Sequence, residues 1–448
     1  MDEHIVFDKA LTRADHAVLE SLTKDIRTHA APPSNKISTI LESDVDSGLG
    51  SDPEPSSGDE TAHAAQHADD RRIAALRAAR SPDSAKFEPT VIVSVDDCSA
   101  ILHPLLNRYL LQPYVRQARK IARHDTDVVM ITHLILYFTT SVPSALLLFC
   151  HFTYTHAILH VIMQGYYIGT YTLMQHQHIH QRGILAEKFR FFDQLYPYIL
   201  DPLMGHTWNT YYFHHVKHHH VEGNGPDDLS STLRFQRDSI PDFLHYVGRF
   251  YFMIWFDLPL YFLRKNRPGL ALKTVVSELA NYAFFYLVSR LAGNKATFFV
   301  YILPCLVLRI GLMVGNWAQH AFVDQDDPDS DFRSSVTLVD VASNRFCFND
   351  GYHTSHHLNP LRHWREHPIS FLEQKHTYAK EGALVFHNID FLMISFRLLA
   401  KDYEHLAKCL VPIGDQINLT MEERVQLLKK STRKFSEEEI ARKFKKTR

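Results

Sequence analysis

Cysteine is scarce in this 448-residue chain. The five cysteines are scattered and form no CxxC pair: Cys98, Cys150, Cys305, Cys347 and Cys409. This distribution argues against both a disulfide framework and a thiolate metal site. The chain also begins without a basic stretch that leads into an apolar core, so we expect no cleavable secretion signal.

Net charge is small as well. The 48 basic and 50 acidic residues give a formal charge of −2 at pH 7, so the overall charge says nothing about partners, and no nucleic-acid partner is expected. The mean hydropathy of −0.19 is too polar for a chain that lies within a membrane throughout. This average hides three regions: a polar first hundred residues, a middle with long apolar runs, and a charged end.

The first 95 residues are predicted to be a mostly disordered polar tail. Between Leu41 and Glu60 there are seven acids and no Lys or Arg, so this stretch cannot bury enough apolar surface to fold. One short helix is expected from Thr12 to Arg27, where Thr12 and Asp15 have the spacing of a capping box.

The middle of the chain contains four apolar runs that are long enough to cross a bilayer, at about 20 residues per span. They pair into two hairpins and cover about residues 128–150, 152–174, 270–292 and 296–315. Basic residues on both sides of the first hairpin place its outer ends in the cytosol. Two further apolar stretches carry charges and are expected at the membrane interface, namely Leu384–Ala400 and Phe243–Leu263.

The second hairpin contains an acid and a base at similar depth. Glu278 and Arg309 each lie roughly seven or eight residues from the cytosolic end, at about 1.5 Å per residue. We therefore predict a buried ion pair, because each charge alone would be costly in hydrocarbon.

Histidines gather in short boxes just beyond the ends of these spans. In MQHQHIHQRG, His176 and His180 are four residues apart and share one helical face, whereas His178 points elsewhere. An HxxxH pair alone is weak evidence for a site, and the His-rich run from His214 to His220 taken alone is also compatible with an exposed tract that binds metal loosely or not at all.

The second box, HHVKHHH, permits two registers. In the first, His215, His218 and His219 form HxxHH and share one narrow helical face. In the second, His215 with His219 and His220 covers a wider arc, and His214 belongs to neither. We favour the first register because the chain repeats its spacing later.

That repeat is GYHTSHHLNP, with His353, His356 and His357. A further pair, Asn316 and His320 in GNWAQHAFVD, has the i, i+4 spacing of one helical face. The favoured registers hold nine histidines, which suits two metal ions with four or five imidazoles each, and Asn316 could add a ligand through water. Imidazole suits zinc or iron. A zinc site needs only three or four protein ligands, so nine favour a pair of irons.

The boxes HxxxH, HxxHH, NxxxH and HxxHH around two membrane hairpins resemble the membrane fatty acid desaturase superfamily, over about Asp127–Trp364. The resemblance implies two iron ions that use O2 to remove hydrogen from an unactivated carbon of a lipid acyl chain. It assigns the metal ligands to nine histidines: His176, His180, His215, His218, His219, His320, His353, His356 and His357. The motif leaves the roles of His178, His214 and His220 open.

Other residues of the site are candidates only. Three acids stand beside the boxes and could hold the outer N–H of an imidazole, or could equally be loop or cap acids: Asp227, Asp228 and Asp350. Three tyrosines of the second span could line an acyl tunnel, or could be ordinary packing within the span: Tyr166, Tyr167 and Tyr171.

The partners implied by the resemblance are an electron donor and a lipid or acyl-thioester substrate. The sequence has no His-Pro-Gly-Gly haem signature, so electrons are expected from a separate cytochrome with its NAD(P)H reductase. The final KKTR resembles a dilysine signal for the endoplasmic reticulum, with the boxes and both termini in the cytosol.

The predicted fold is an all-α membrane protein with four transmembrane helices in two hairpins, a cytosolic His-rich helical cap and a disordered N-terminal tail. A desaturase domain covers residues 100–400, and 401–448 form a charged helical tail with capping boxes at Thr420/Glu423 and Ser436/Glu439. Acyl-chain hydroxylases and acetylenases share these boxes. A His-rich zinc-binding membrane transporter or hydrolase is an alternative from another class, although a transporter would place its histidines within the spans.

Overall fold

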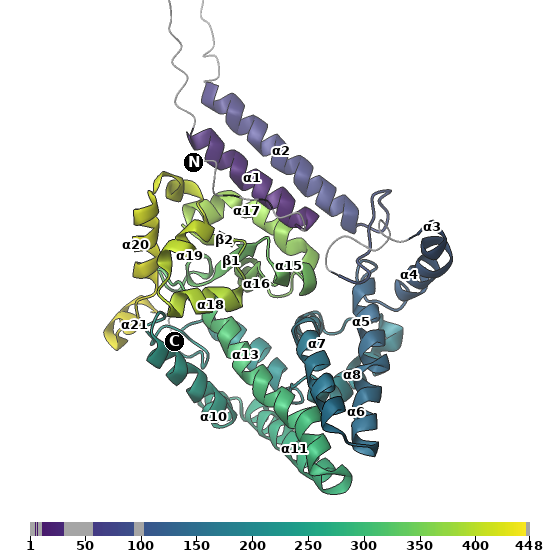
Figure 1. Ribbon diagram of the computed structural model, residues 1–448. Helices are drawn as coiled ribbons and strands as arrows, with labels where there is room; N and C mark the ends of the chain where they lie inside the picture. Colours follow the sequence, from purple (N-terminus) through teal and green to yellow (C-terminus); the bar gives the residue numbers. More distant parts are fainter. Residues whose placement is uncertain (1–4, 6, 8–10, 31–56, 94–102, 445–448) are drawn as a thin grey trace, which may run out of the picture.

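The computed structural model describes residues 5, 7, 11–30, 57–93 and 103–444. Long helices occupy one end of the molecule, in the lower part of Figure 1, and a helical layer around a small sheet occupies the other. The long helices are α5 (Val128–Thr139), α6 (Ser141–Cys150), α7 (Tyr154–Gln181), α8 (Arg190–Leu203), α10 (Ile240–Arg264), α11 (Pro268–Ala292) and α13 (Leu303–Gln319). Short helices before α5 are α3 (Pro104–Leu106), η2 (Asn107–Leu111) and α4 (Gln112–Ala118), and those between the long helices are η3 (Glu187–Phe189), η4 (Tyr212–His219), α9 (His220–Glu222), α12 (Asn294–Thr297) and η5 (Phe298–Ile302).

The first expected hairpin corresponds to α5 and α6 followed by α7. The first arm breaks at Thr140, whose hydroxyl donates to the carbonyl of Leu136 (2.6 Å). Pro143 cannot donate a backbone N–H, so the helical ladder is interrupted there. The second arm, α7, is 28 residues long and carries the first histidine box on the same continuous helix.

The second expected hairpin is α11 followed by α12, η5 and α13, with Gly293 at the turn (φ 110°). Glu278 of α11 and Arg309 of α13 form an ion pair, and the Thr207 hydroxyl also donates to Glu278 (2.8 Å). The predicted buried ion pair is confirmed.

Among the described residues, two helical stretches are long and apolar enough to cross a membrane: Val128–Cys150 and Asn294–Gln319. The four-span arrangement therefore stays a prediction. The stretch expected at the interface is one continuous helix, α10, which packs against α11 and α13. Arg249 and Asp257 pair on it (3.4 Å), which lessens the cost of their charges.

The all-α expectation is wrong in one region, because the layer contains a three-stranded sheet. Strand β1 (Val336–Val339) pairs in parallel with β2 (Leu384–His387), and β2 pairs antiparallel with β3 (Leu410–Val411). Leu384–Ala400, expected at the membrane interface, supplies the buried middle strand and α18 (Phe391–Leu399), so the interface stays a prediction for α18 alone. Strands of two to four buried residues have no alternating pattern that sequence reasoning could detect. The other elements of the layer are α14 (Asp331–Ser334), α15 (Ala342–Phe346), α16 (His353–Leu358), η6 (Trp364–Glu366), α17 (His367–Lys380), α19 (Tyr403–Cys409), η7 (Gly414–Asn418), α20 (Met421–Ser431) and α21 (Glu437–Lys443).

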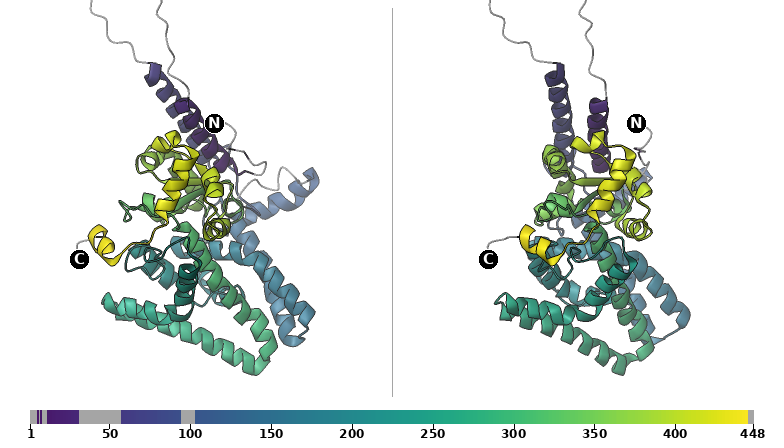
Figure 2. Two further views of the ribbon diagram at one scale, coloured as in Figure 1. Left: turned by 60° about the vertical axis from the view of Figure 1, so that its left-hand side comes forward. Right: turned by 90° about the vertical axis from the view of Figure 1, so that its left-hand side faces the viewer.

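The short helix expected from Thr12 to Arg27 is confirmed, but the expectation of disorder is wrong for residues 57–93. Helices α1 (Arg13–Ala30) and α2 (Ser57–Arg80) lie side by side (Figure 1, and the right-hand view of Figure 2), and both contact α17. Apolar residues of α1 join a buried cluster with α17, so folding is driven by tertiary contacts that composition cannot reveal. Most of the acidic stretch, residues 41–56, lies outside the described residues.

The predicted caps at both ends of the chain are found. Helix α1 begins at Arg13, and the Thr12 hydroxyl accepts from the Asp15 N–H (2.7 Å). Complete capping boxes begin α20 and α21, at Thr420/Glu423 and Ser436/Glu439. The final KKTR lies outside the described residues.

Candidate metal centre

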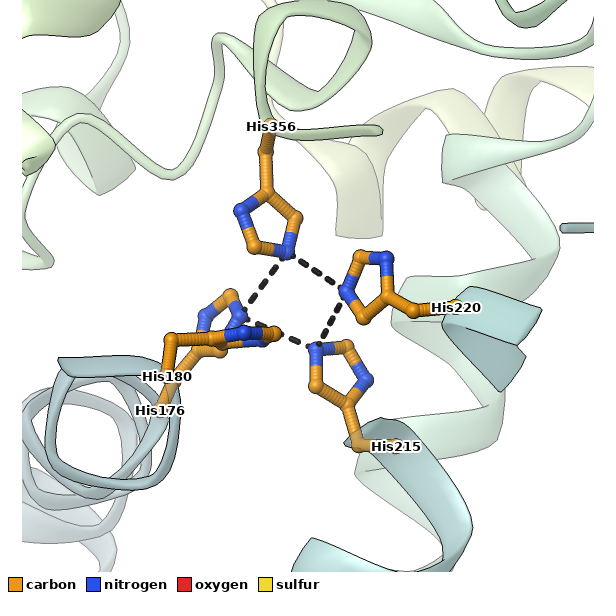
Figure 3. Close-up of side chains that lie close together, drawn as sticks. All are labelled: His176, His180, His215, His220 and His356. Atoms are coloured by element: carbon orange, nitrogen blue, oxygen red, sulfur yellow. Dashed lines mark hydrogen bonds between the residues drawn. The ribbon is translucent and has the colours of Figure 1, made fainter. Parts of the chain in front are cut away.

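Five histidines from three boxes converge at one buried point (Figure 3). They come from α7, from η4 and α9, and from α16: His176, His180, His215, His220 and His356. Four of their Nε2 atoms form a closed ring of contacts. His176 Nε2 lies 2.9 Å from His215 Nε2 and 3.0 Å from His356 Nε2. His220 Nε2 closes the ring, 3.1 Å from His215 Nε2 and 2.8 Å from His356 Nε2.

A second cluster of four histidines adjoins the first: His219, His320, His353 and His357. The rings of His220 and His357, one from each cluster, are 5.1 Å apart between centroids. The second and third boxes each contribute to both clusters, because adjacent histidines point to opposite sides of the helix end. Together the two clusters hold nine imidazoles.

The structure places His220, not His218, with His215 and His219. The favoured HxxHH register assumed an α-helix, but residues 212–219 form a π-helix. The wider i→i+5 turn brings residues four and five apart onto one face, and His215 contacts the rings of His219 and His220 accordingly. The histidines that the structure brings together therefore follow the wider HxxxHH register.

His218 faces a loop instead. Its Nε2 accepts from the Leu229 N–H (3.1 Å), and its ring packs on Tyr261. His214 and His218 form a third group with Asp228, but the nearest His218–Asp228 contact is 3.9 Å.

Asp228 orients a histidine of the second cluster. Its Oδ2 lies 2.8 Å from His219 Nδ1, and Ser230 donates to its Oδ1 (2.7 Å). Burial would raise the pKa of Asp228, but His219 and its other partners hold that pKa well below the usual range. A carboxylate at Nδ1 fixes the N–H there and leaves the Nε2 lone pair facing the cluster. The Ser334 carbonyl accepts from His320 Nδ1 (2.7 Å) to the same effect.

Burial keeps the imidazoles of the first cluster neutral, and it does the same for His320, His353 and His357 of the second. Burial, followed by repulsion from neighbouring histidines, lowers the pKa of His180 to about 3 and that of His320 to about 4. The pKa values of His215, His353 and His356 are lowered well below 6.5 for the same reasons. Neutral imidazole is the form that binds metal.

The arrangement fits metal ions better than hydrogen bonding. Hydrogen bonds cannot satisfy a closed ring of four Nε2 atoms, because a ring nitrogen of a neutral imidazole carries either an N–H or a lone pair and cannot both donate and accept. The Nε2 atoms of His180 and His357, one in each cluster, are buried without a partner among the described residues. Lone pairs that converge in this way match ligands about 2.0–2.1 Å from a shared ion.

An apolar cavity of about 330 Å³ reaches the clusters between α7, α10 and α13. A smaller cavity of about 80 Å³ adjoins it and reaches the Glu278–Arg309 pair. Five residues line both cavities: Tyr211, His214, Phe250, Leu308 and Leu312.

The tyrosines proposed for a tunnel do not line these cavities. The cavity-facing residues of α7 are Ile168, Gly169, Thr172, Leu173 and His176. At 100° per residue, Tyr167 and Tyr171 lie on the opposite side of α7 from His176, and Tyr171 donates to Asp201 (2.6 Å). Tyr166 is 83% exposed. Counting back from His176 at 100° per residue would have identified the face of α7 that lines the cavity.

The remaining candidates lie outside the clusters. His178 contacts the Asp193 carbonyl (3.0 Å) and so ties α7 to α8. Asp227 pairs with Lys265 near the surface (2.8 Å). Asp350 lines the larger cavity, where burial raises its pKa to about 7. Asn316 lines the same cavity and donates to Ser230 and Tyr246.

Sequence reasoning missed Tyr211, whose ring stacks on His215 (5.2 Å between centroids) beside the cavity. Its position four residues before His215 is the only signal that points to it.

The fold and site together define a class: a mostly helical protein with apolar membrane-type helices and a buried double cluster of histidines. Residues 152–388, more than half of the chain, match the family described as fatty acid desaturase. The chain belongs to this family, and the resemblance seen in its histidine boxes is confirmed. No curated protein and no solved structure matches the chain.

Proposed function

We propose that this chain is a membrane enzyme that uses O2 and a pair of irons to desaturate a lipid acyl chain. The observation that carries the proposal is the double cluster of nine buried or half-buried imidazoles beside an apolar cavity. His176, His180, His215, His220 and His356 would hold one iron. His219, His320, His353 and His357 would hold the other. When bound, such a pair supplies the O2 chemistry that side chains lack.

The protein's own residues position the reacting groups. The acyl chain would lie in the two adjoining cavities, with Phe250, Leu308 and Leu312 excluding water along its length. Tyr211 packs on His215 at the wall where the chain approaches the first cluster. Asp228 and the Ser334 carbonyl fix the tautomers of His219 and His320.

The membrane arrangement follows from the site. All boxes meet at one place, so an even number of crossings must separate the second box from Asn316. Helices α11 and α13 would then be the two crossings, with α10 along the cytosolic interface. The basic residues on both sides of the first hairpin favour a cytosolic position for the histidine centre and both termini, where a cytochrome and its NAD(P)H reductase would supply electrons. The endoplasmic reticulum is the membrane we propose.

Iron analysis and product analysis test the proposal together. We expect about two irons per chain after purification in detergent, and an O2-dependent unsaturated lipid after expression in yeast. His180→Ala and His320→Ala, one in each cluster, should each lose metal and product. His245→Ala, exposed and outside both clusters, should keep them. Zinc without iron would favour the transporter or hydrolase alternative, and a hydroxylated or acetylenic lipid would identify the related activities.

A further inference from the structure

The N-terminal helix α1 reaches the third histidine box through one buried carboxylate. Asp15 is 1% exposed, and it accepts from the Tyr352 hydroxyl (2.7 Å) and from the Asn344 amide (3.1 Å). Tyr352 immediately precedes His353, a member of the second cluster. Helix α1, which lies in the segment that composition predicts to be a polar tail, therefore contacts the residue next to a histidine of the second cluster.

Asn344 extends this contact to the backbone of the box. Its amide also donates to the Leu338 carbonyl (2.9 Å), and its oxygen accepts from the Gly351 N–H (2.8 Å). A Cβ on Gly351 would lie 2.5 Å from the Asn344 oxygen, so only glycine fits. The two residues before His353 are thus fixed on three sides, by β1, by Asn344 and by Asp15.

The rest of α1 and α2 is anchored strongly enough to hold Asp15 in place. Lys375 of α17 is buried and contacts Ser21 (2.8 Å), Asp25 (2.7 Å) and Asp69 (2.6 Å). A buried lysine shared by three partners is typical of a specific interface, because each group would be costly to bury alone.

We propose that Asp15 is a positioning residue: through Tyr352 and Asn344 it orients Gly351–His353, so that His353 and His357 present their imidazoles to the second cluster. The role in metal binding rests on the proposed function. Helices α1 and α2 are accordingly part of the catalytic unit, and the chain segment before the first span is required for a fully loaded centre.

The test compares two variants of α1 with a matched destabilised control. Asp15→Ala removes the acceptor, and Asp15→Asn keeps the shape but places an amide N–H beside that of Asn344. Leu22→Ala weakens the same interface, by about 2–5 kcal/mol, without touching the Asp15 contacts. Glu20→Gln, at the surface of the same helix, controls for any change of charge.

Two readouts separate positioning from stability. In metal-free protein, we expect amide hydrogen exchange of residues 349–358 to be about tenfold faster in the Asp15 variants and near wild type in Leu22→Ala. The affinity for iron should fall by about tenfold in Asp15→Ala. It should stay at the wild-type value in the two controls, Leu22→Ala and Glu20→Gln. Tyr352→Phe should produce the same loss, and the double variant should lose little more.

Wild-type exchange and iron affinity in Asp15→Ala would overturn the inference, and so would an equal loss in Leu22→Ala. If wild-type protein binds no iron at all, the proposed function fails. The exchange measurement then still decides whether Asp15 orders the box.

Discussion

At the scale of single residues, backbone geometry decides which histidines meet. His218 and His220 are both plausible partners of His215 by spacing, and a regular α-turn favours His218. The π-turn at residues 212–219 rotates His218 towards Leu229 and brings His220 into the first cluster. π-Turns commonly occur at functional sites, where they re-aim side chains.

This geometry predicts opposite outcomes for two neighbouring substitutions. His220→Ala should lower iron affinity and turnover by about 100-fold or more, since it removes a ligand. His218→Ala should stay within about tenfold, because it disturbs only the loop that holds Asp228. Iron content and product formation in purified protein measure both, and a dead His218→Ala beside an active His220→Ala would contradict the assignment.

At the scale of elements, the Glu278–Arg309 pair links α11 to α13. Their side chains are 6% and 16% exposed, so each depends on the other for compensation of its charge. The pair also borders the smaller cavity, which places it at the end of the proposed acyl site.

Removing one partner should therefore cost more than removing both. We expect Glu278→Leu or Arg309→Met alone to destabilise the protein by about 3–5 kcal/mol, and the double variant to recover much of that loss. Thermal unfolding in detergent provides the comparison. Additive losses in the double variant would show that the two charges are not coupled.

The arrangement of the helices in the membrane is testable by labelling. With the five native cysteines replaced, single cysteines at Arg267 and Asp327 should react from the cytosol, and one at Asn294 only from the lumen. All three positions are exposed. Luminal labelling at position 267 would mean that α10 crosses the membrane and would refute the four-span arrangement.

At the scale of the whole molecule, burying many histidines makes stability depend on pH. Folding lowers the pKa of His180, His206 and His367 to about 3 and that of His320 to about 4, mainly through burial. The unfolded chain takes up protons below its ordinary histidine pKa of about 6.5, and the folded chain does not. Stability from these groups is therefore present above pH 6.5 and is lost as the pH falls towards 3–4.

Metal-free protein should accordingly become less stable in mild acid. One such histidine contributes a loss of about 2 kcal/mol between pH 7 and pH 5, and several would remove most of a typical stability. We expect the Tm of the metal-free protein to fall steeply over this range, as measured by thermal unfolding in detergent. A flat profile would mean that the histidines are already solvated in the folded state.

The sequence by itself determined the helical class, the positions of the apolar hairpins, the Glu278–Arg309 pair and eight of the nine clustered histidines. These features depend on local periodicity and on the chemistry of individual residues, both of which can be recognised in short stretches of the chain. Tertiary structure decided the rest. The register of the second box depends on a π-turn, the three short strands depend on one another, and the packing of α1 and α2 on α17 depends on apolar residues of all three helices. Such features are stabilised by contacts between residues far apart in sequence, and no local pattern encodes them.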